Sequence, residues 1–350
     1  MNNQVLKPIL EVNDLHIEFH AQNQIYQAVR GVSFQIQKGE TVALVGESGC
    51  GKSALAQSIM KLIPMPPGKV TQGQILFQGE DLLSVSDKTL QNIRGKDISM
   101  IFQDSMASLN PTMRIGSQIK EIINRHQNLS SDVVHKKIID LLNSVGIPMP
   151  ERRMQQYPHE FSGGMRQRVS IAIAMACHPQ LLIADEPTTA LDVTIQAQIL
   201  DLMRTMQKKM GMSILLITHD LGVVAGMCDR VMVMYAGKII EEGTVDQIYS
   251  NPEHPYTHAL LKSVPRLDSA KLDELDSIKG SPPDLSAPPL GCPFFARCPY
   301  AMEMCRNNMP SFFKSELDHY SACWLLDPRA KKEKQLFDQD KLAFKGKLSQ

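Results

Sequence analysis

The chain lacks any stretch of the ~18 uninterrupted apolar residues that a membrane-spanning helix needs. Its start, Met1 to Gln4, also lacks the basic and then apolar segments of a secretion signal. We therefore expect the protein to stay in the cytosol and to reach a membrane only through partner proteins.

An excess of charge of one sign is missing as well, because 37 Lys and Arg residues balance 37 Asp and Glu residues. A balanced chain has no electrostatic footprint for nucleic acid, so we expect no nucleic-acid partner. Aromatic residues make up only 5% of the chain, whereas apolar residues make up 43%. That composition is typical of a globular α/β protein with an ample core, and 350 residues correspond to about two domains.

One glycine-rich segment matches the phosphate-binding pattern G-x-x-x-x-G-K-[ST]. It lies between an apolar run typical of a buried strand, Thr41 to Val45, and a helical pattern over Ser53 to Met60. In such a loop the backbone N–H groups point at a polyphosphate, and the helix N-terminus adds partial positive charge. We expect Lys52 to contact the β- and γ-phosphates of a nucleotide and Ser53 to hold Mg²⁺. The residues of the segment are Gly46, Glu47, Ser48, Gly49, Cys50, Gly51, Lys52 and Ser53.

Two more apolar runs end in polar residues, as central parallel strands do when they open onto a ligand crevice. One run ends in Asp185 and Glu186, and the other leads to His219. Asp185 is placed to hold Mg²⁺ through its water shell, and Glu186 to polarise the attacking water. We expect His219 to contact the γ-phosphate.

The segment Phe161 to Arg168 completes a resemblance to the ATP-binding cassette family. In that family a serine and two glycines open a helix whose N-terminus faces the γ-phosphate of the opposite subunit. The resemblance assigns this role to Ser162, Gly163 and Gly164. The first and fifth residues of the segment, Phe and Met, stand where the family usually has Leu and Gln, outside the phosphate-facing part.

The resemblance also implies roles for residues outside these motifs. Gln103 would join the Mg²⁺ site to a transmembrane partner, Ala190-Leu191-Asp192 would cross the interface of a cassette dimer, and His219 would act as the switch histidine. The family also stacks an aromatic ring on adenine. Phe19 is the first choice for that ring, and Tyr26 is the alternative.

Residues 251–265 resemble the segment that follows the cassette in importers of peptides and nickel, which other cassette proteins generally lack. The resemblance divides the chain into a nucleotide-binding domain over residues 1–250, with a helical subdomain at about 105–165, and a C-terminal region over residues 251–350. Within the segment, His254 and His258 fit a capping or packing role better than metal binding.

The expected fold class is α/β: a cassette-type P-loop NTPase core with an antiparallel β subdomain, a helical subdomain and a small cysteine-containing extension. Helical periodicity is clearest at Ile115 to Ile123 and at Val133 to Val145. Arg230 to Ile240 is a predicted hairpin, and the charged run at residues 331–334 is interpreted as a solvated tail. Alternating residues predict half-exposed strands at residues 9–12, 15–19 and 32–36.

Four of the seven cysteines cluster late in the sequence, at Cys292, Cys298, Cys305 and Cys323. Disulfides are not expected in the cytosol, whereas four thiolates can hold a [4Fe–4S] cluster or a tetrahedral zinc ion. The spacing lacks the C-x-x-C knuckles of structural zinc sites. The sequence has two Cys-Pro steps, which resemble the Cys-Pro steps found near iron–sulfur clusters. Some peptide-importer ATPases with this kind of C-terminal region carry such a cluster. We therefore predict a [4Fe–4S] cluster on these residues, with zinc or unligated thiols as the alternatives.

The resemblance implies an ATPase subunit of an importer of dipeptides or oligopeptides, with ATP and Mg²⁺ bound between two cassettes. The expected partners are a homologous second ATPase subunit, two transmembrane permease subunits and a periplasmic or extracellular substrate-binding protein. The chain would then lie at the cytoplasmic face of the membrane. Three alternatives stay open: import of nickel chelates or other peptide-like solutes, a soluble cassette ATPase acting on DNA or ribosomes, and a redox-sensing regulator.

Overall fold

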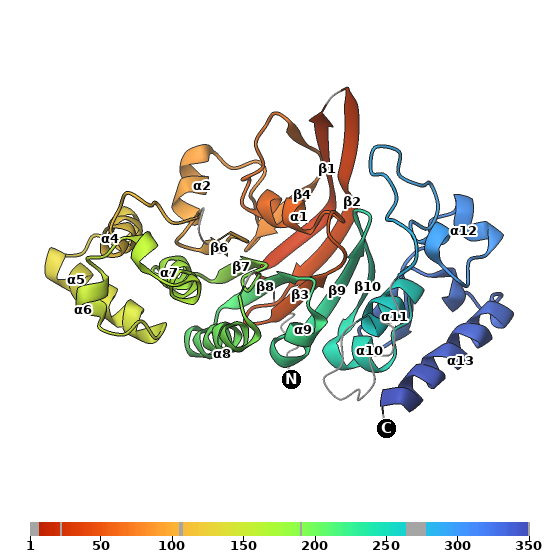
Figure 1. Cartoon of the computed structure of the whole chain (residues 1–350). Coiled ribbons are helices and arrows are strands. Elements are labelled where there is room, and N and C mark those ends of the chain that lie inside the picture. The colour runs from red at the N-terminus through yellow and green to blue at the C-terminus, as the bar shows by residue number, and fades with distance from the viewer. Residues whose placement is uncertain (1–6, 22, 105–107, 190, 264–277, 349–350) are drawn as a thin grey trace, which may run out of the picture. The chain divides into compact units, whose positions relative to one another are not determined.

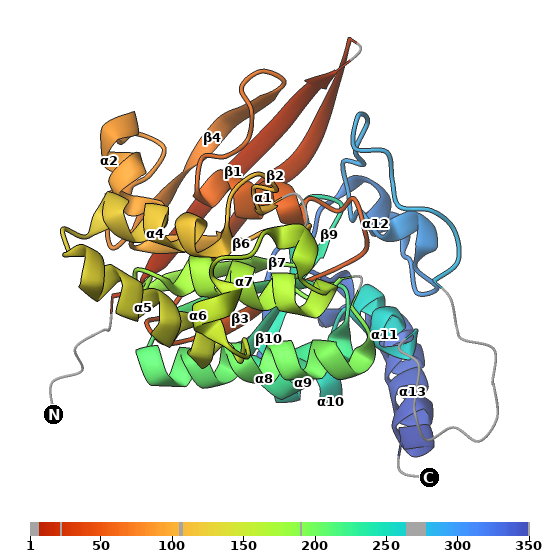
Figure 2. The same ribbon diagram turned by 60° about the vertical axis from the view of Figure 1, so that its left-hand side comes forward.

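The computed structural model describes residues 7–21, 23–104, 108–189, 191–263 and 278–348 (Figures 1 and 2). Its contacts divide the chain into two compact units. The first unit consists of Met1–Glu11, Gln35–Thr41 and Leu76–Ile217, and the second of Val12–Phe34, Val42–Ile75 and Thr218–Gln350. The domain boundary that we place at residue 250 stays a prediction, because these units follow contacts rather than sequence order.

The second unit contains the strands that carry the phosphate-binding loop. β3 (Thr41–Val45) runs parallel to β9 (Arg230–Tyr235), and β9 pairs antiparallel with β10 (Lys238–Thr244). β12 (His319–Ser321) and β11 (Phe313–Glu316) extend this ladder to the order β11-β12-β10-β9-β3. All five residues of β3 are buried, as expected of a strand covered on both faces.

A second group of strands precedes and follows the loop in sequence. β1 (Leu10–Ala21), β2 (Gln24–Ile36) and β4 (Gly68–Phe77) lie in the order β2-β1-β4, and β4 ends in an antiparallel pair with β5 (Glu80–Asp81). β1 is one continuous strand of 12 residues where the sequence pattern indicates two short ones. The turn between β9 and β10 lies at Ala236-Gly237, where both residues have positive φ, so the predicted hairpin is confirmed.

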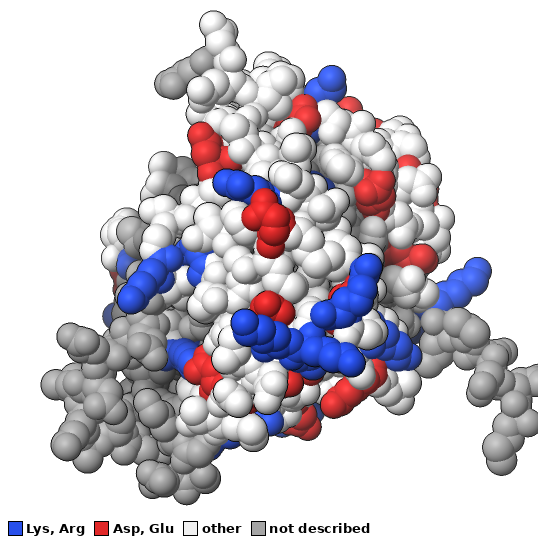
Figure 3. All heavy atoms as spheres, turned by 90° about the vertical axis from the view of Figure 1, so that its right-hand side faces the viewer, with Lys and Arg blue, Asp and Glu red and all other residues white. Residues whose placement is uncertain are grey.

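The helices of the second unit include a C-terminal helix that corrects one expectation. The charged run at residues 331–334 opens α13 (Lys331–Leu348) rather than a solvated tail. Phe337 in this helix is fully buried, and Asp340 forms an ion pair with Lys262 at 2.7 Å. On the face shown in Figure 3, Lys and Arg side chains lie among Asp and Glu side chains. The other helices of this unit are α1 (Lys52–Ile59), α9 (Leu221–Met227), α10 (Val245–Ser250), α11 (Pro255–Lys262) and α12 (Glu303–Asn307).

The first unit contains a parallel ladder of β6 (Ile98–Ile101), β7 (Leu181–Asp185) and β8 (Ser213–Thr218). Every residue of β7 and β8 is buried, which explains why their sequences are continuous apolar runs rather than alternating ones. Because β7 and β8 run parallel, their carboxyl ends lie at the same edge. The acidic residues that follow β7 are therefore presented at that edge.

The helices of the first unit follow the predicted periodicity. α4 (Ile115–His126) and α5 (Ser131–Ser144) confirm the two clearest helical segments, and both pack beside α7 (Gly163–Met175) (Figure 2). Within the part of the chain that the structure describes, no helix has the length and apolarity to cross a bilayer. The remaining helices are α2 (Asp87–Ile93), α6 (Pro150–Arg153) and α8 (Val193–Met210).

Candidate functional site

The phosphate-binding loop joins β3 to α1, and only glycine fits at two of its positions. A Cβ on Gly46 would lie 2.2 Å from the carbonyl oxygen of Met234, and a Cβ on Gly51 would lie 2.1 Å from that of Ala28. Gly49 has a left-handed φ of +78°, and its missing Cβ faces open space. The loop is therefore packed against the backbone at Ala28 and Met234 on one side and open at Gly49, as a cradle for a phosphate requires.

Lys52 begins α1 and is 6% exposed. Its ammonium donates to the carbonyl oxygens of Gly46 at 2.8 Å and Glu47 at 2.9 Å, so it lies across the loop. Burial raises the pKa of Cys50 above the usual thiol range, which keeps this side chain a neutral thiol. A lysine across an open glycine loop fits the binding of a polyphosphate.

Two residues of the C-terminal region contact this loop, and the sequence motifs do not identify either of them. The Tyr256 hydroxyl accepts a hydrogen bond from the backbone N–H of Glu47 at 2.9 Å. The Arg297 guanidinium forms an ion pair with the Glu47 carboxylate at 2.7 Å. These partners are 209 and 250 positions from Glu47 in the chain, beyond the reach of any local sequence pattern.

Glu186 follows β7 in a backbone conformation that is unusual for a side chain with a Cβ. Its φ is +47°, and its N–H donates to the carbonyl of Ile217 at 2.9 Å. Its carboxylate accepts hydrogen bonds from Gln103 Nε2 and Thr189 Oγ1, both at 2.9 Å. The structure therefore brings Gln103 and Glu186 together. Strain of this kind is typical of functional sites.

Asp185, the last residue of β7, is 3% exposed. A carboxylate at the carboxyl end of a parallel strand lies at the edge where such sheets bind ligands, which fits a metal ligand. Its assignment to Mg²⁺ stays a prediction.

The signature segment opens α7 with its polar end exposed. Ser162 caps the helix, since its Oγ accepts a hydrogen bond from the backbone N–H of Met165 at 3.3 Å. A Cβ on Gly164 would lie 2.8 Å from Ile195, whereas one on Gly163 would meet no atom closer than 3.8 Å. The segment thus presents a helix N-terminus, the kind of backbone end that binds phosphate.

The roles stay predictions for His219, for residues 190–192 and for the two candidate adenine-stacking rings. His219 is exposed directly after β8, and Asp192 caps α8 through a hydrogen bond from the N–H of Ile195 at 2.9 Å. Ala190 lies outside the described residues. Phe19 on β1 and Tyr26 on β2 are both half-buried, so the choice of adenine-stacking ring stays open.

The capping interpretation of His254 is confirmed. It is the N-cap of α11, and its Nδ1 accepts a hydrogen bond from the N–H of Tyr256 at 3.0 Å. Burial lowers the pKa of His254 to about 3, so the ring is neutral at physiological pH. His258, also buried, packs against the rings of Phe337 and Phe344.

The predicted [4Fe–4S] cluster is wrong, and so is zinc as its alternative. Among the residues that the structure describes, no group of three or more His, Cys, Asp or Glu side chains is arranged to hold a metal ion. Burial raises the pKa of Cys292 to about 11 and that of Cys298 to about 12, so both side chains are neutral thiols at physiological pH. Cys292, Cys298, Cys305 and Cys323 are all free cysteines and line one apolar pocket.

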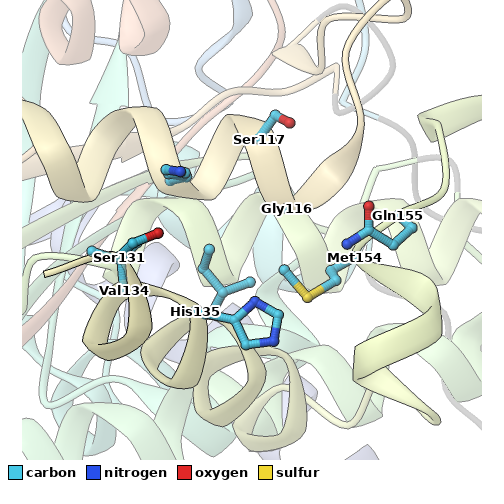
Figure 4. A pocket seen from close by; sticks show the side chains of 9 residues that line it. Gly116, Ser117, Ser131, Val134, His135, Met154 and Gln155 are labelled. Carbon is cyan, nitrogen blue, oxygen red and sulfur yellow. The ribbon is translucent and has the colours of Figure 1, made fainter.

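A separate pocket of about 190 Å³ lies between α4 and α5 in the first unit, with none of the nucleotide motifs in its wall. Figure 4 shows the ring of His135 on α5 directed toward the thioether of Met154, with Ser117 on α4 above them. The pocket lies within the helical subdomain that the resemblance places at about residues 105–165.

Comparisons with known proteins bear on these motifs. The family described as ABC transporter matches residues 29–189, and the family described as the C-terminal region of oligopeptide/dipeptide transporters matches residues 240–305. The oligopeptide transport ATP-binding protein OppD of Bacillus subtilis (strain 168) is 58% identical over 324 residues, 93% of this chain and 90% of that protein. The dipeptide transport ATP-binding protein DppD of the same organism is 55% identical over 93% of this chain and 97% of that protein.

Solved structures show the same fold. The ATP-binding cassette MJ0796, solved as a dimer in a post-hydrolysis state bound to ADP and Pi, has a TM-score of 0.61 and 26% identity, and covers 67% of this chain and 98% of its own. The cbiO1 protein of Clostridium perfringens has a TM-score of 0.60 and 29% identity, over 70% of this chain and 92% of its own. The predicted cassette-type α/β fold is therefore confirmed. With two relatives above 50% identity over nine tenths of the chain, this protein belongs to the ATP-binding subunits of ABC transporters, among those of the oligopeptide and dipeptide transporters.

Proposed function

We propose that this chain hydrolyses ATP to drive the import of dipeptides or oligopeptides. The observation that carries the proposal is a buried lysine across a glycine loop, in the same chain as the C-terminal region of oligopeptide/dipeptide transporters. OppD and DppD are named for oligopeptide and dipeptide transport, which favours peptides over nickel chelates. Neither relative is named for DNA or ribosomes, so that alternative gains no support.

The loop from Gly46 to Ser53 binds the phosphates in this proposal. The ammonium of Lys52, which contacts two loop carbonyls, turns to the β- and γ-phosphates, where the opposite charge is far stronger. Ser53 and Asp185 supply oxygen atoms for Mg²⁺, the donor type that this ion prefers. The magnesium ion would offset phosphate charge during transfer.

Hydrolysis depends on Glu186, whose carboxylate orients and polarises the attacking water. The hydrogen bond from Gln103 fixes one oxygen of this carboxylate and links it to the helical segment that follows. His219 contacts the γ-phosphate. The helix N-terminus at Ser162, Gly163 and Gly164 completes the ATP site of the partner subunit, because its exposed end offers N–H groups to phosphate.

The proposed function requires three kinds of partner protein. A second, homologous ATPase subunit completes the pair of sites, two permease subunits form the passage, and a substrate-binding protein outside the cytoplasmic membrane delivers the peptide. This chain would be a peripheral subunit at the cytoplasmic face. The helical segment at about 105–165, with its pocket between α4 and α5, would contact a permease.

A reconstituted complex of this chain with its partner ATPase and permeases in vesicles tests the proposal. Phosphate release should rise when a peptide-loaded binding protein is added outside, and Glu186→Gln should remove the response. Stimulation by nickel chelates in place of peptides would redirect the substrate assignment. A complex that binds no ATP would overturn the proposal.

A further inference from the structure

Arg297 reaches the phosphate loop from the C-terminal region through a two-pronged ion pair. Its Nη1 donates to Oε2 of Glu47 at 2.7 Å, and its Nη2 donates to Oε1 at 3.0 Å. The Arg297 side chain is 5% exposed and that of Glu47 is 23% exposed. Bidentate pairs of this geometry fix direction as well as charge.

The remaining donors of Arg297 hold the guanidinium in place. Nε donates to the carbonyl of Lys279 at 3.0 Å, Nη2 to that of Ile278 at 3.0 Å, and Nη1 to the hydroxyl of Tyr235 at 3.1 Å. With the two bonds to Glu47, all five N–H donors of an arginine are used. The rings of Tyr235 and Phe294 lie 5.8 and 5.9 Å from the guanidinium carbon. The cation is therefore fixed before any ligand arrives.

The negative charge of Glu47 lies where it would repel the phosphates of the proposed ligand. It lies between Gly46 and Ser48 in the phosphate-binding loop, and its own carbonyl contacts Lys52. A carboxylate beside a polyphosphate repels it unless a cation offsets the charge. Among the described residues, the structure provides this cation through Arg297.

We propose that Arg297 is a positioning residue for nucleotide binding, which neutralises Glu47 and holds the phosphate loop in place. This inference rests on the proposed function of the loop in binding ATP. It gives the C-terminal region a direct part in nucleotide affinity, because both the Arg297 guanidinium and the Tyr256 hydroxyl contact Glu47. A purely packing role for Arg297, between residues 278–279 and the two rings, is the competing explanation.

Equilibrium binding of Mg·ATP to the full chain distinguishes the two explanations. Arg297→Met keeps most of the side-chain volume between the rings and removes the cation. It should weaken ATP affinity by about tenfold, as expected of one uncompensated carboxylate, and the loss should shrink with added salt. The double variant Arg297→Met with Glu47→Gln should regain affinity to within about twofold of wild type, because the repelling charge is gone.

Rescue by the second substitution is the decisive result, since a packing role predicts none. A double variant as weak as Arg297→Met, or a single variant with wild-type affinity, would overturn the inference. Where the Met variant does not fold, Arg297→Gln, whose amide can still donate to the nearby carbonyls, goes through the same comparison with the same expected rescue. Arg329→Ala, which breaks an exposed pair with Asp327 in the same region, is the matched control and should leave affinity unchanged. A wild-type chain that does not bind ATP would instead contradict the proposed function.

Discussion

Glu47 in the phosphate loop and Glu186 after β7 are both carboxylates beside nucleotide motifs, but their partners differ in charge and in distance along the chain. Glu47 pairs with a guanidinium 250 positions away, whereas Glu186 accepts hydrogen bonds from the neutral donors Gln103 and Thr189 within its own unit. A charged partner cancels a carboxylate, and a neutral donor only orients it. Arg297 therefore offsets the charge of Glu47, whereas the hydrogen bonds from Gln103 and Thr189 orient the carboxylate of Glu186.

The support of the phosphate loop extends into a buried network of the second unit. Glu241 on β10 is fully buried, and its carboxylate accepts hydrogen bonds from the N–H groups of Glu253 and His254. His319 Nε2 lies 2.8 Å from the same carboxylate. This network fixes the segment that leads to Tyr256, and through it the contact with Glu47.

The largest expected effect comes from breaking that network. Glu241→Ala should lower the free energy of unfolding by about 3–5 kcal/mol, because it leaves buried donors without an acceptor. Urea unfolding measures the loss. Glu303→Ala, which removes an exposed pair with Arg306, is the control and should leave the unfolding curve unchanged. A Glu241→Ala curve that matches the control would show that the network does not hold this region.

The next effect tests the loop itself. Lys52→Ala should weaken Mg·ATP binding by about a hundredfold, because the cation that offsets phosphate charge is lost. Titration of the purified chain with ATP measures the change, with the exposed Lys69→Ala on β4 as the control. An unchanged dissociation constant would show that Lys52 does not bind the phosphates. The comparison of Glu47 with Glu186 would then lose its basis, because Glu47 would not lie beside bound nucleotide.

Ser162→Arg tests whether the signature segment acts across a subunit interface. Its bulk should lower hydrolysis at the partner's ATP by at least about tenfold, while this chain's own loop binds ATP as before. Ser162→Ala removes only the cap of α7 and should cost about 1 kcal/mol of stability. Mixing Ser162→Arg with Lys52→Ala subunits measures the sharing. Hydrolysis confined to a single isolated chain would contradict the shared site.

A smaller effect follows from the buried histidines of the C-terminal region. Burial lowers the pKa of His254 to about 3 and that of His258 to about 4, although Asp340 opposes the second shift and Lys262 and Lys341 add to it. Since the unfolded pKa is about 6.5, the neutral rings stabilise the fold above that pH, and this stability is lost as the pH falls below it. Each histidine should lower the free energy of unfolding by about 1 kcal/mol between pH 6.5 and 5.5.

Urea unfolding at pH 7 and pH 5.5 measures that loss. His258→Leu keeps an apolar contact with Phe337 and Phe344. It should reduce the pH dependence of the free energy of unfolding by the contribution of one histidine. The same slope in the variant and the wild type would show that His258 does not remain neutral in the fold.

The nucleotide motifs and their elements could be predicted from sequence because their signals are local. Gly46, Gly51 and Lys52 stand at the fixed spacing of the phosphate-binding pattern, and the apolar run at Leu181–Asp185 is a strand buried on both faces. Such requirements act within a few residues, so they leave a readable pattern. The helices near Ile115 and Val133 were predictable for the same reason.

What the sequence could not reveal depends on distant partners. Arg297 is one arginine among many until the fold places it against Glu47, and the charged start of α13 looks solvated until Phe337 is buried. The prediction of a metal cluster on the four cysteines is wrong for a related reason. Their spacing permits metal binding, but in the part of the chain that the structure describes no group of three or more His, Cys, Asp or Glu side chains is arranged to hold a metal ion, and that arrangement depends on the fold rather than on spacing.

Hydrolysis by Glu186→Gln tests the central claim most directly, because the substitution keeps the shape of the side chain and removes its charge. The account predicts that the variant binds ATP as the wild type does and releases phosphate at least about a hundredfold more slowly, so that closed, ATP-bound assemblies accumulate. Phosphate release within about twofold of the wild-type rate would contradict the assignment of Glu186 and the comparison built on it.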